Sequence, residues 1–283
     1  WDSLASQFQH QQPPLRPCAE DIRIFQNIIH DWRRRHFSRQ IKVLLFGVTP
    51  EIAGLAWPEN TFLLAVEKSQ AMIDAVWPGN ISGQRQVIQG NWFDVQVEKH
   101  SFDFVIGDGF MTALAYPHQY QQIAETISQW LQPEGRLLAR LFTRTEKKET
   151  PAVILADLQA KRIKRFDILK WRLAMMLQEN VRQGVAVDEI YRAWNRIEKQ
   201  WPSLVEETGW PRPTVNTIRL YAGRVDRYAF PTVRELSGAF SPCLESVSTT
   251  IPGYDFGECC PILVYRRAQP AESKKTVDAR SQS

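Results

Sequence analysis

Apolar residues recur along the chain in two patterns. Between residues 19 and 38 they are spaced as on one face of a helix, at Ile22, Phe25, Ile28 and Ile29. Short apolar runs typical of buried strands follow at residues 42–46, 61–66, 85–89, 102–106 and 136–142. Helical or turn-like stretches, such as 69–76 and 119–131, separate them. This alternation predicts a Rossmann-like, doubly wound α/β fold whose mostly parallel sheet is covered on both faces.

The pattern changes after the fifth predicted strand. Residues 151–200 are helical in character and rich in charge, and strand-like runs return only at 244–250 and 262–266. We therefore predict a core made of residues 1–145 and 226–267, interrupted by a helical insertion over 146–225. The polar stretch 268–283 is expected to be a flexible tail. Because the insertion follows a strand end, it is expected to form a lid over the ligand cleft.

Composition narrows the class of protein. The chain has 283 residues, 43% of them hydrophobic, and a formal net charge of +4, which alone is too weak to indicate nucleic-acid binding. No run approaches the roughly 20 apolar residues of a membrane span, and the first residues lack the pattern of a secretory signal. The four cysteines lack the spacing of a zinc site. We expect a cytoplasmic protein with no bound metal and no membrane partner.

A ligand site is predicted where the first two strands end. Gly47 allows a tight turn after the first strand, and Thr49 and Pro50 suit the start of a helix. Glu67 ends the second strand, 20 residues after Gly47. A carboxylate at this position can accept the two hydroxyl protons of a ribose, which predicts a nucleoside derivative as ligand.

The charge at the first turn distinguishes between such ligands. A dinucleotide places its pyrophosphate over a glycine-rich turn at a helix N-terminus. Here the further glycines are missing, and Glu51 adds a negative charge that repels phosphate. S-adenosylmethionine carries an ammonium and a sulfonium and has no phosphate, so it fits the charge better. Glu51 also has a purely structural interpretation, as a first-turn residue that complements the helix dipole.

Four short motifs carry a resemblance to a known family. They are Gly-Val-Thr-Pro-Glu at 47–51, Val-Glu-Lys-Ser at 66–69, Gly-Asn-Trp at 90–92 and Phe-Asp-Phe-Val-Ile-Gly-Asp-Gly at 102–109. Their order resembles that of class I S-adenosylmethionine-dependent methyltransferases, in the branch with a Gly-x-Thr-Pro-Glu first turn. The resemblance covers residues 12–142 and, more weakly, 231–267. It implies the class I methyltransferase fold, S-adenosylmethionine as cofactor and S-adenosylhomocysteine as product.

The resemblance also implies a role for each matching residue. Those near the methionine and ribose are Gly47, Val48, Thr49 and Glu67, with Glu67 holding the ribose hydroxyls. Lys68, Asn91 and Trp92 are expected around the adenine. Asp108 and Gly109 are expected to face the methionine or the substrate, and Arg16 to pair with the cofactor's carboxylate. The chain departs from the family at Leu45 and Asn91, where many members carry acids.

The acceptor is indicated mainly by what the motifs lack. The fourth strand is followed neither by the Asn/Asp-Pro-Pro-Tyr of nucleic-acid amino methylation nor by a nucleophilic cysteine. We predict direct in-line transfer of the methyl group to an O or N atom of a small molecule, with Asp108 and His118 as candidate catalytic bases.

Three alternatives remain open. The first is a nucleic-acid or protein methyltransferase that uses a basic insertion helix with the run Lys161–Arg165, a run for which a solvated helix face is the favoured interpretation. The second is a nucleotide-dependent oxidoreductase. The third is a non-catalytic binding or interaction protein that keeps the fold, which the departures at Leu45 and Asn91 would fit. The sequence leaves the oligomeric state open.

Overall fold

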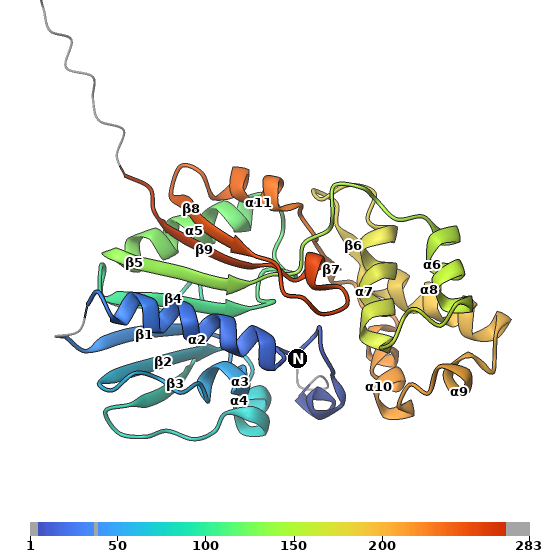
Figure 1. Cartoon of the computed structure of the whole chain (residues 1–283), viewed down its shortest axis with the longest axis horizontal. Coiled ribbons are helices and arrows are strands. Elements are labelled where there is room, and N and C mark those ends of the chain that lie inside the picture. The colour runs from blue at the N-terminus through green and yellow to red at the C-terminus, as the bar shows by residue number, and fades with distance from the viewer. Residues whose placement is uncertain (1–4, 37–38, 270–283) are drawn as a thin grey trace, which may run out of the picture.

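A seven-stranded sheet forms the centre of the protein (Figure 1). The computed structural model describes residues 5–36 and 39–269. The strand order across the sheet is β3-β2-β1-β4-β5-β9-β8. The strands are β1 (Ile41–Phe46), β2 (Thr61–Glu67), β3 (Arg85–Gln89), β4 (Phe102–Asp108), β5 (Leu131–Arg140), β8 (Leu244–Thr250) and β9 (Ile262–Arg267). Strands β1 to β5 pair in parallel, whereas β9 runs antiparallel between β5 and β8.

Helices cover both faces of the sheet, which confirms the predicted doubly wound fold. On one face, α2 (Ala19–Arg33), α3 (Pro50–Ala53) and α4 (Gln70–Val76) pack on alternate strand residues such as Val43 and Leu45. On the other face, α5 (His118–Trp130) and α11 (Val233–Phe240) pack on Leu44 and Phe46. Successive residues of a strand point to opposite faces, so an apolar run without alternation is buried on both.

Most predicted element boundaries lie within two residues of those in the structure, and those of the first helix and the fifth strand differ by more. The first helix ends at Arg33, and residues 37–38 lie outside the described residues. Strand β5 begins at Leu131 rather than Arg136, because Leu131 pairs with Phe102 before a register shift in the ladder. The flexible tail predicted over 268–283 lies outside the described residues except for its first two. No helix in the described ranges is long and apolar enough to cross a membrane.

The segment after β5 forms a helical body at the carboxyl ends of the parallel strands (Figure 1). Its elements are α6 (Pro151–Gln159), α7 (Phe166–Leu177), β6 (Val185–Ala186), α8 (Val187–Gln200), α9 (Leu204–Thr208), α10 (Arg212–Asn216) and η2 (Thr217–Tyr221). Strand β6 pairs with β7 (Arg227–Tyr228), so the body extends slightly beyond residue 225. Edge-to-face contacts of Phe166 with Trp194 and Trp210 fill its own core.

The run Lys161–Arg165 is not part of a helix. It lies in the connection between α6 and α7, where Lys161 adopts a positive φ of 53°. Arg162 pairs with Asp157 at 2.6 Å, and the Lys164 ammonium donates to the carbonyl of Lys161. The expectation of a basic helix at this position is therefore wrong, because the left-handed residue ends the preceding helix.

An N-terminal segment, residues 8–17 with the short helix η1 (Phe8–His10), connects the sheet to the insertion. The amide of Gln12 donates to Asp167 of α7 at 2.8 Å, and the hydroxyl of Thr214 donates to the carbonyl of His10. On the sheet side, Arg140 of β5 donates to the carbonyl of Pro14 at 2.8 Å. On the same side, the loop between β8 and β9 contains the short helix η3 (Gly257–Cys259).

Candidate functional site

A cavity of about 420 Å³ lies between the strand ends, the N-terminal segment and the insertion. It sits beyond the carboxyl ends of β1, β2 and β4, where ligands bind in open α/β sheets. Every residue that the sequence assigned to the cofactor lines this cavity. They are Arg16, Gly47, Val48, Thr49, Glu67, Lys68, Asn91, Trp92, Asp108 and Gly109. The fold thus brings together side chains from five separate stretches of sequence, while their contact with a cofactor stays a prediction.

Glu67 lies directly opposite the first turn. Gly47 has a φ of +81°, a conformation that favours glycine, and a Cβ at this position would lie 3.6 Å from Oε2 of Glu67. The other carboxylate oxygen, Oε1, accepts from the amide of Ser69 at 2.8 Å. Burial raises the pKa of Glu67, although the amides of Ser69 and Lys68 counteract it. The carboxylate is therefore fixed, partly desolvated and turned towards Gly47.

A cluster of charges surrounds the first turn. Arg16 pairs with Glu51 through Nη2 and Oε1 at 2.5 Å, and Arg140 pairs with Asp108 at 2.6 Å and with Asp21 at 3.7 Å. The second oxygen of Glu51, Oε2, is buried without a hydrogen-bond partner. Three carboxylates therefore face two guanidinium groups, which leaves one negative charge. This excess fits a ligand with ammonium or sulfonium charge and opposes a pyrophosphate.

Arg140 is a residue of this site that the sequence reasoning missed. Its side chain is fully buried at the end of β5 and contacts Asp108, the carbonyl of Pro14 and, at 3.4 Å, the hydroxyl of Tyr254. Burial alone lowers the pKa of Arg140, but the carboxylate of Asp108 raises it well above its usual range. The available signal was an arginine inside an otherwise apolar predicted strand.

At the adenine side of the predicted site, polar groups are already partly engaged. Oδ1 of Asn91 accepts from the amide of Phe93 at 3.2 Å, and its amide group donates to Asp94 at 3.0 Å. The indole of Trp92 donates to the carbonyl of Val66 at 2.9 Å, and its ring contacts Phe46 and Phe110. Trp92 therefore belongs both to the core and to the cavity wall.

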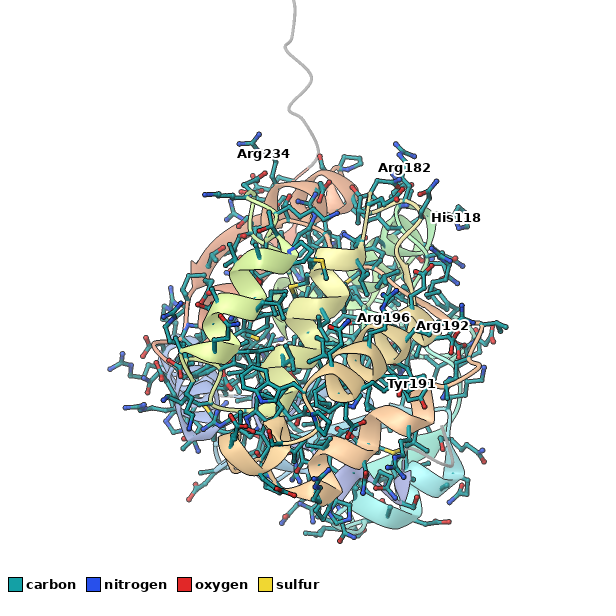
Figure 2. All side chains as sticks on the ribbon, turned by 90° about the vertical axis from the view of Figure 1, so that its right-hand side faces the viewer. His118, Arg182, Tyr191, Arg192, Arg196 and Arg234 are labelled. Atoms are coloured by element: carbon teal, nitrogen blue, oxygen red, sulfur yellow. The ribbon has the colours of Figure 1, made fainter. Side chains whose placement is uncertain are left out.

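His118, the second candidate base, and Asp103, an acid of the fourth motif, both lie away from the cavity. His118 is the first residue of α5; it is exposed, does not line the cavity, and projects from the outer surface in Figure 2. A base must reach the proton that it removes, so this placement gives His118 no support as a catalytic residue. Asp103 is buried near the start of β4, where it accepts from the amide of Lys42 and pairs with Arg39. Its role is structural.

The insertion adds aromatic residues to the cavity that the sequence did not assign to the site. Trp171 of α7, Tyr221 of η2 and Tyr228 of β7 line it together with Phe142, which follows β5. By contrast, Trp194 is buried inside the insertion, and Tyr191 lies on the outer face of α8 (Figure 2). Sequence alone cannot separate these two groups, because each is spaced as in an ordinary helical core.

Comparison with known proteins shows the fold. No family model and no curated protein matches the chain. A solved structure described as a putative Zn-dependent alcohol dehydrogenase from Rhodobacter sphaeroides is 13% identical, with a TM-score of 0.55, and the alignment covers 94% of this chain and 98% of that one. The N-methyltransferase NodS from Bradyrhizobium japonicum, solved with S-adenosylhomocysteine, is 11% identical, with a TM-score of 0.47 and coverages of 95% and 100%.

A putative methyltransferase from Haloferax volcanii, solved with the Trm112 activator, is 9% identical, with a TM-score of 0.49 and coverages of 95% and 97%. The deciding observation is the topology itself: five parallel strands followed by the order β5-β9-β8, with β9 antiparallel to both neighbours. The chain has the class I methyltransferase fold. In this fold the cavity lies where a cofactor is expected. No group of three or more His, Cys, Asp or Glu residues suited to a metal ion occurs in the described parts of the chain.

Proposed function

We propose that this protein is an S-adenosylmethionine-dependent methyltransferase that acts on an O or N atom of a small-molecule acceptor. The observation that supports this most is the position of the Glu67 carboxylate, which faces the Gly47 turn. This turn lies next to a charge cluster with one excess negative charge. A nucleoside ligand that carries positive charge satisfies both features. All four cysteines are free thiols, which suits a reducing compartment such as the cytoplasm.

Each part of the cavity then has a defined task. Glu67 accepts the ribose hydroxyls, and Gly47 lets the ligand approach the backbone. Asp108 attracts the ammonium group, with Glu51 adding negative potential from behind the cavity wall, while Trp92 packs against the adenine. When bound there, the cofactor would supply an electrophilic methyl group for direct transfer to the acceptor O or N atom, with the electron pair of the broken carbon–sulfur bond left on sulfur.

Asp108 is the candidate proton acceptor. It lines the cavity at the end of β4, and its Oδ1 is held by the Nε of Arg140 at 2.6 Å. This contact fixes the carboxylate, so that Oδ2 takes the proton that leaves the acceptor O or N atom. The insertion and the N-terminal segment keep water from the transferring methyl group.

The decisive experiment is isothermal titration with S-adenosylhomocysteine, S-adenosylmethionine and NAD in parallel. We expect S-adenosylhomocysteine to bind with a dissociation constant of roughly micromolar or tighter, and NAD to bind at least about a hundredfold more weakly. NAD binding of equal or greater strength would instead identify a nucleotide-dependent oxidoreductase. Failure of both S-adenosyl ligands to bind would reject the proposal.

No specific observation favours the other two alternatives, a nucleic-acid or protein methyltransferase and a non-catalytic binding protein. The run Lys161–Arg165 that was to contact nucleic acid forms a connection in which Arg162 is paired with Asp157. A purely binding role is distinguished by cofactor binding without turnover. The cavity extends well beyond the predicted cofactor residues into the insertion, as expected of an enzyme with a second substrate.

A further inference from the structure

Four aromatic side chains form a continuous surface along the insertion side of the cavity. This aromatic wall consists of Phe142, Trp171, Tyr221 and Tyr228. Neighbouring rings meet edge to face: Phe142 and Trp171 at 5.2 Å, Trp171 and Tyr228 at 5.7 Å, and Tyr228 and Tyr221 at 5.9 Å between centroids. None of the residues predicted to bind the cofactor belongs to the aromatic wall, so the wall is available to a second ligand.

The aromatic wall begins where the fourth strand ends. A Cβ on Gly109 would lie 2.6 Å from Cε2 of Phe142, so this ring packs closely on the backbone beside Asp108. At the other end of the wall, the amide of Ala229, next to Tyr228, donates to the carbonyl of Thr112 at 2.8 Å. The hydroxyl of Tyr120 donates to the carbonyl of Met111 at 2.9 Å and also lies 3.3 Å from that of Ala229. The wall is thus fixed against the loop that follows β4, beside the predicted position of the methyl group.

Charge is distributed unequally across the cavity. Among the described residues, the charged side chains that line it are Arg16, Glu67, Lys68 and Asp108, all on the sheet side or on the N-terminal segment. The other polar side chains that line the cavity, Gln11, Thr112 and Gln119 among them, are neutral. Two cations contact rings of the aromatic wall from behind, Arg140 at 5.5 Å from the Phe142 centroid and Lys170 at 5.6 Å from that of Tyr221, but each is already paired with a carboxylate. An anionic acceptor would compete with these carboxylates for its countercharge, and placing a charge there would carry a large desolvation cost.

The tyrosines of the wall favour a neutral ligand as well. Burial raises the pKa of Tyr221 and of Tyr228, so both phenols stay protonated. A side-chain hydrogen bond joins the two hydroxyls, which leaves the pair one donor for a ligand. The ammonium of Lys170 already lies 5.6 Å from the ring centroid of Tyr221 and pairs with Asp167 at 2.7 Å. Because this buried cation already interacts with the Tyr221 ring, a cationic ligand gains less from that ring.

We propose that the aromatic wall is the acceptor site and that it binds an uncharged aromatic molecule bearing a hydroxyl or amino group. The acceptor ring packs against Trp171 and Tyr228, and the tyrosine hydroxyls hydrogen-bond to its polar substituents. This inference rests on the proposed methyltransferase function, since it assigns the second substrate of the same cavity. Aromatic contacts of this kind supply both apolar burial and edge-to-face packing.

The test compares three probes that share one ring system and differ in charge. The protein is saturated with S-adenosylhomocysteine and titrated with 2-naphthol, 2-naphthoate and 2-naphthylmethylammonium. We expect 2-naphthol to bind at least about tenfold more tightly than either charged probe. Equal or tighter binding of 2-naphthoate or of the ammonium compound would overturn the proposal and reassign the acceptor to that charge class.

Matched variants locate the binding site. Tyr228→Phe removes one hydroxyl from the aromatic wall, and we expect it to weaken 2-naphthol binding by about three- to tenfold, as for the loss of one hydrogen bond. Phe142→Leu, which reduces ring packing, should weaken it as well. Tyr191→Phe is the control, because Tyr191 lies on the outer face of α8, away from the cavity (Figure 2). Equal loss in Tyr191→Phe, or no loss in both wall variants, would overturn the proposal.

Binding of S-adenosylhomocysteine is measured on every variant, and it separates the two hypotheses. If the wild-type protein binds S-adenosylhomocysteine but not 2-naphthol, the acceptor proposal fails and the methyltransferase proposal stands. If it binds no S-adenosylhomocysteine, the methyltransferase proposal itself fails. We expect S-adenosylhomocysteine affinity to change less than about twofold in Tyr228→Phe, since that residue lies on the insertion side.

Discussion

At the scale of single residues, the cavity contains buried charges that destabilise the folded protein but are placed where the proposed cofactor would contact them. Glu67 is an example, because its carboxylate is partly desolvated and its pKa is raised by burial. An acid whose pKa is higher in the folded than in the unfolded protein destabilises the fold once it is ionised. Such residues are common where a ligand later supplies the missing partners.

The first prediction is that Glu67→Gln weakens cofactor binding while slightly stabilising the free protein. Loss of the charged acceptor for the ribose hydroxyls should weaken S-adenosylhomocysteine binding by about fivefold to more than a hundredfold. Urea unfolding at pH 8 should show equal or greater stability than wild type. Glu59→Gln, at an exposed position, serves as the control and should change neither quantity. Unchanged affinity in Glu67→Gln would show that the carboxylate does not contact the ligand.

The second prediction concerns pH. The pKa of Glu67 is raised, so its protonation begins above the ordinary range of a glutamate. Since the ionised form accepts the ribose hydroxyls, affinity for S-adenosylhomocysteine should fall as pH decreases through this raised pKa. The stabilising effect of Glu67→Gln should decline over the same range, because the penalty is full above the folded-state pKa and falls to zero at the lower unfolded-state pKa. Calorimetric titrations and urea unfolding between pH 4 and 8 on wild type and Glu67→Gln measure the two effects, and identical pH profiles would contradict the assignment.

At the scale of elements, the buried Arg140 connects segments that are distant in sequence. It links β5 to Asp108 of β4, to Pro14 of the N-terminal segment and to Tyr254 of the loop between β8 and β9. The hydroxyl of Tyr254 in turn donates to Asp21 of α2 at 2.9 Å. These contacts hold the cavity's sheet side and its N-terminal cover in one arrangement.

The third prediction is that Arg140→Met is strongly destabilising at neutral pH. It leaves two buried carboxylates without a countercharge, and breaking a buried pair in this way costs about 3–5 kcal/mol. The deficit should shrink as pH falls, because the unpaired carboxylates then have raised pKa values and take up protons. Arg162→Met, which removes an exposed pair with Asp157, should cost at most about 1 kcal/mol. Equal unfolding free energies for the two variants would refute this role of Arg140.

The fourth prediction tests the strand pair that carries Tyr228. Gly184 has a φ of +61°, and a Cβ there would overlap the carbonyl oxygen of Tyr228. Gly184→Ala should therefore displace β7 and cost clearly more than Gly209→Ala, whose φ of +70° is similar but whose Cβ would meet nothing within 4 Å. The latter should cost roughly 1–2 kcal/mol from backbone strain alone. Urea unfolding of both variants, with 2-naphthol titrations of each, measures the difference; equal costs would contradict the predicted overlap.

At the scale of the whole molecule, the insertion and the core share one cavity but have separate apolar interiors. The core packs on both faces of the sheet, whereas the insertion is centred on Phe166, Trp194 and Trp210. Contacts between them include the N-terminal segment, the residues Phe142, Cys259 and Cys260, and the hydrogen bond from Ala229 to Thr112. We therefore expect that the insertion can move as a lid without unfolding the sheet.

The fifth prediction is that ligands reduce the mobility of the lid. Amide hydrogen exchange in residues 146–225 should be faster than in β1 and β4, and S-adenosylhomocysteine together with an acceptor should slow it. Replacing the insertion by a short loop should leave a protein that binds cofactor but does not methylate. Normal turnover by the shortened protein would show that the insertion is not the acceptor site. If the shortened chain does not fold, hydrogen exchange on the intact protein still tests the lid.

The sequence determined the order of elements and the part of the cavity lining that we propose as the cofactor site. Continuous apolar runs predicted the parallel strands, because a strand buried on both faces has no polar alternation. The first-turn motif and the acid ending the second strand located Gly47 and Glu67, because parallel strands place their carboxyl ends at one edge. Such local patterns depend on neighbours in the chain, so they can be read without the fold.

Only the tertiary structure decided which distant residues meet. Arg140 contacts Asp108, Pro14 and Tyr254, which are distant from it in sequence. His118 is not supported as a catalytic base, because it lies on the exposed side of α5. Likewise, Trp171 and Tyr228 line the cavity while Trp194 fills a core, although all are aromatic residues of one insertion. Periodicity specifies that a side chain is buried; whether it is buried against the protein or against a ligand depends on packing between elements.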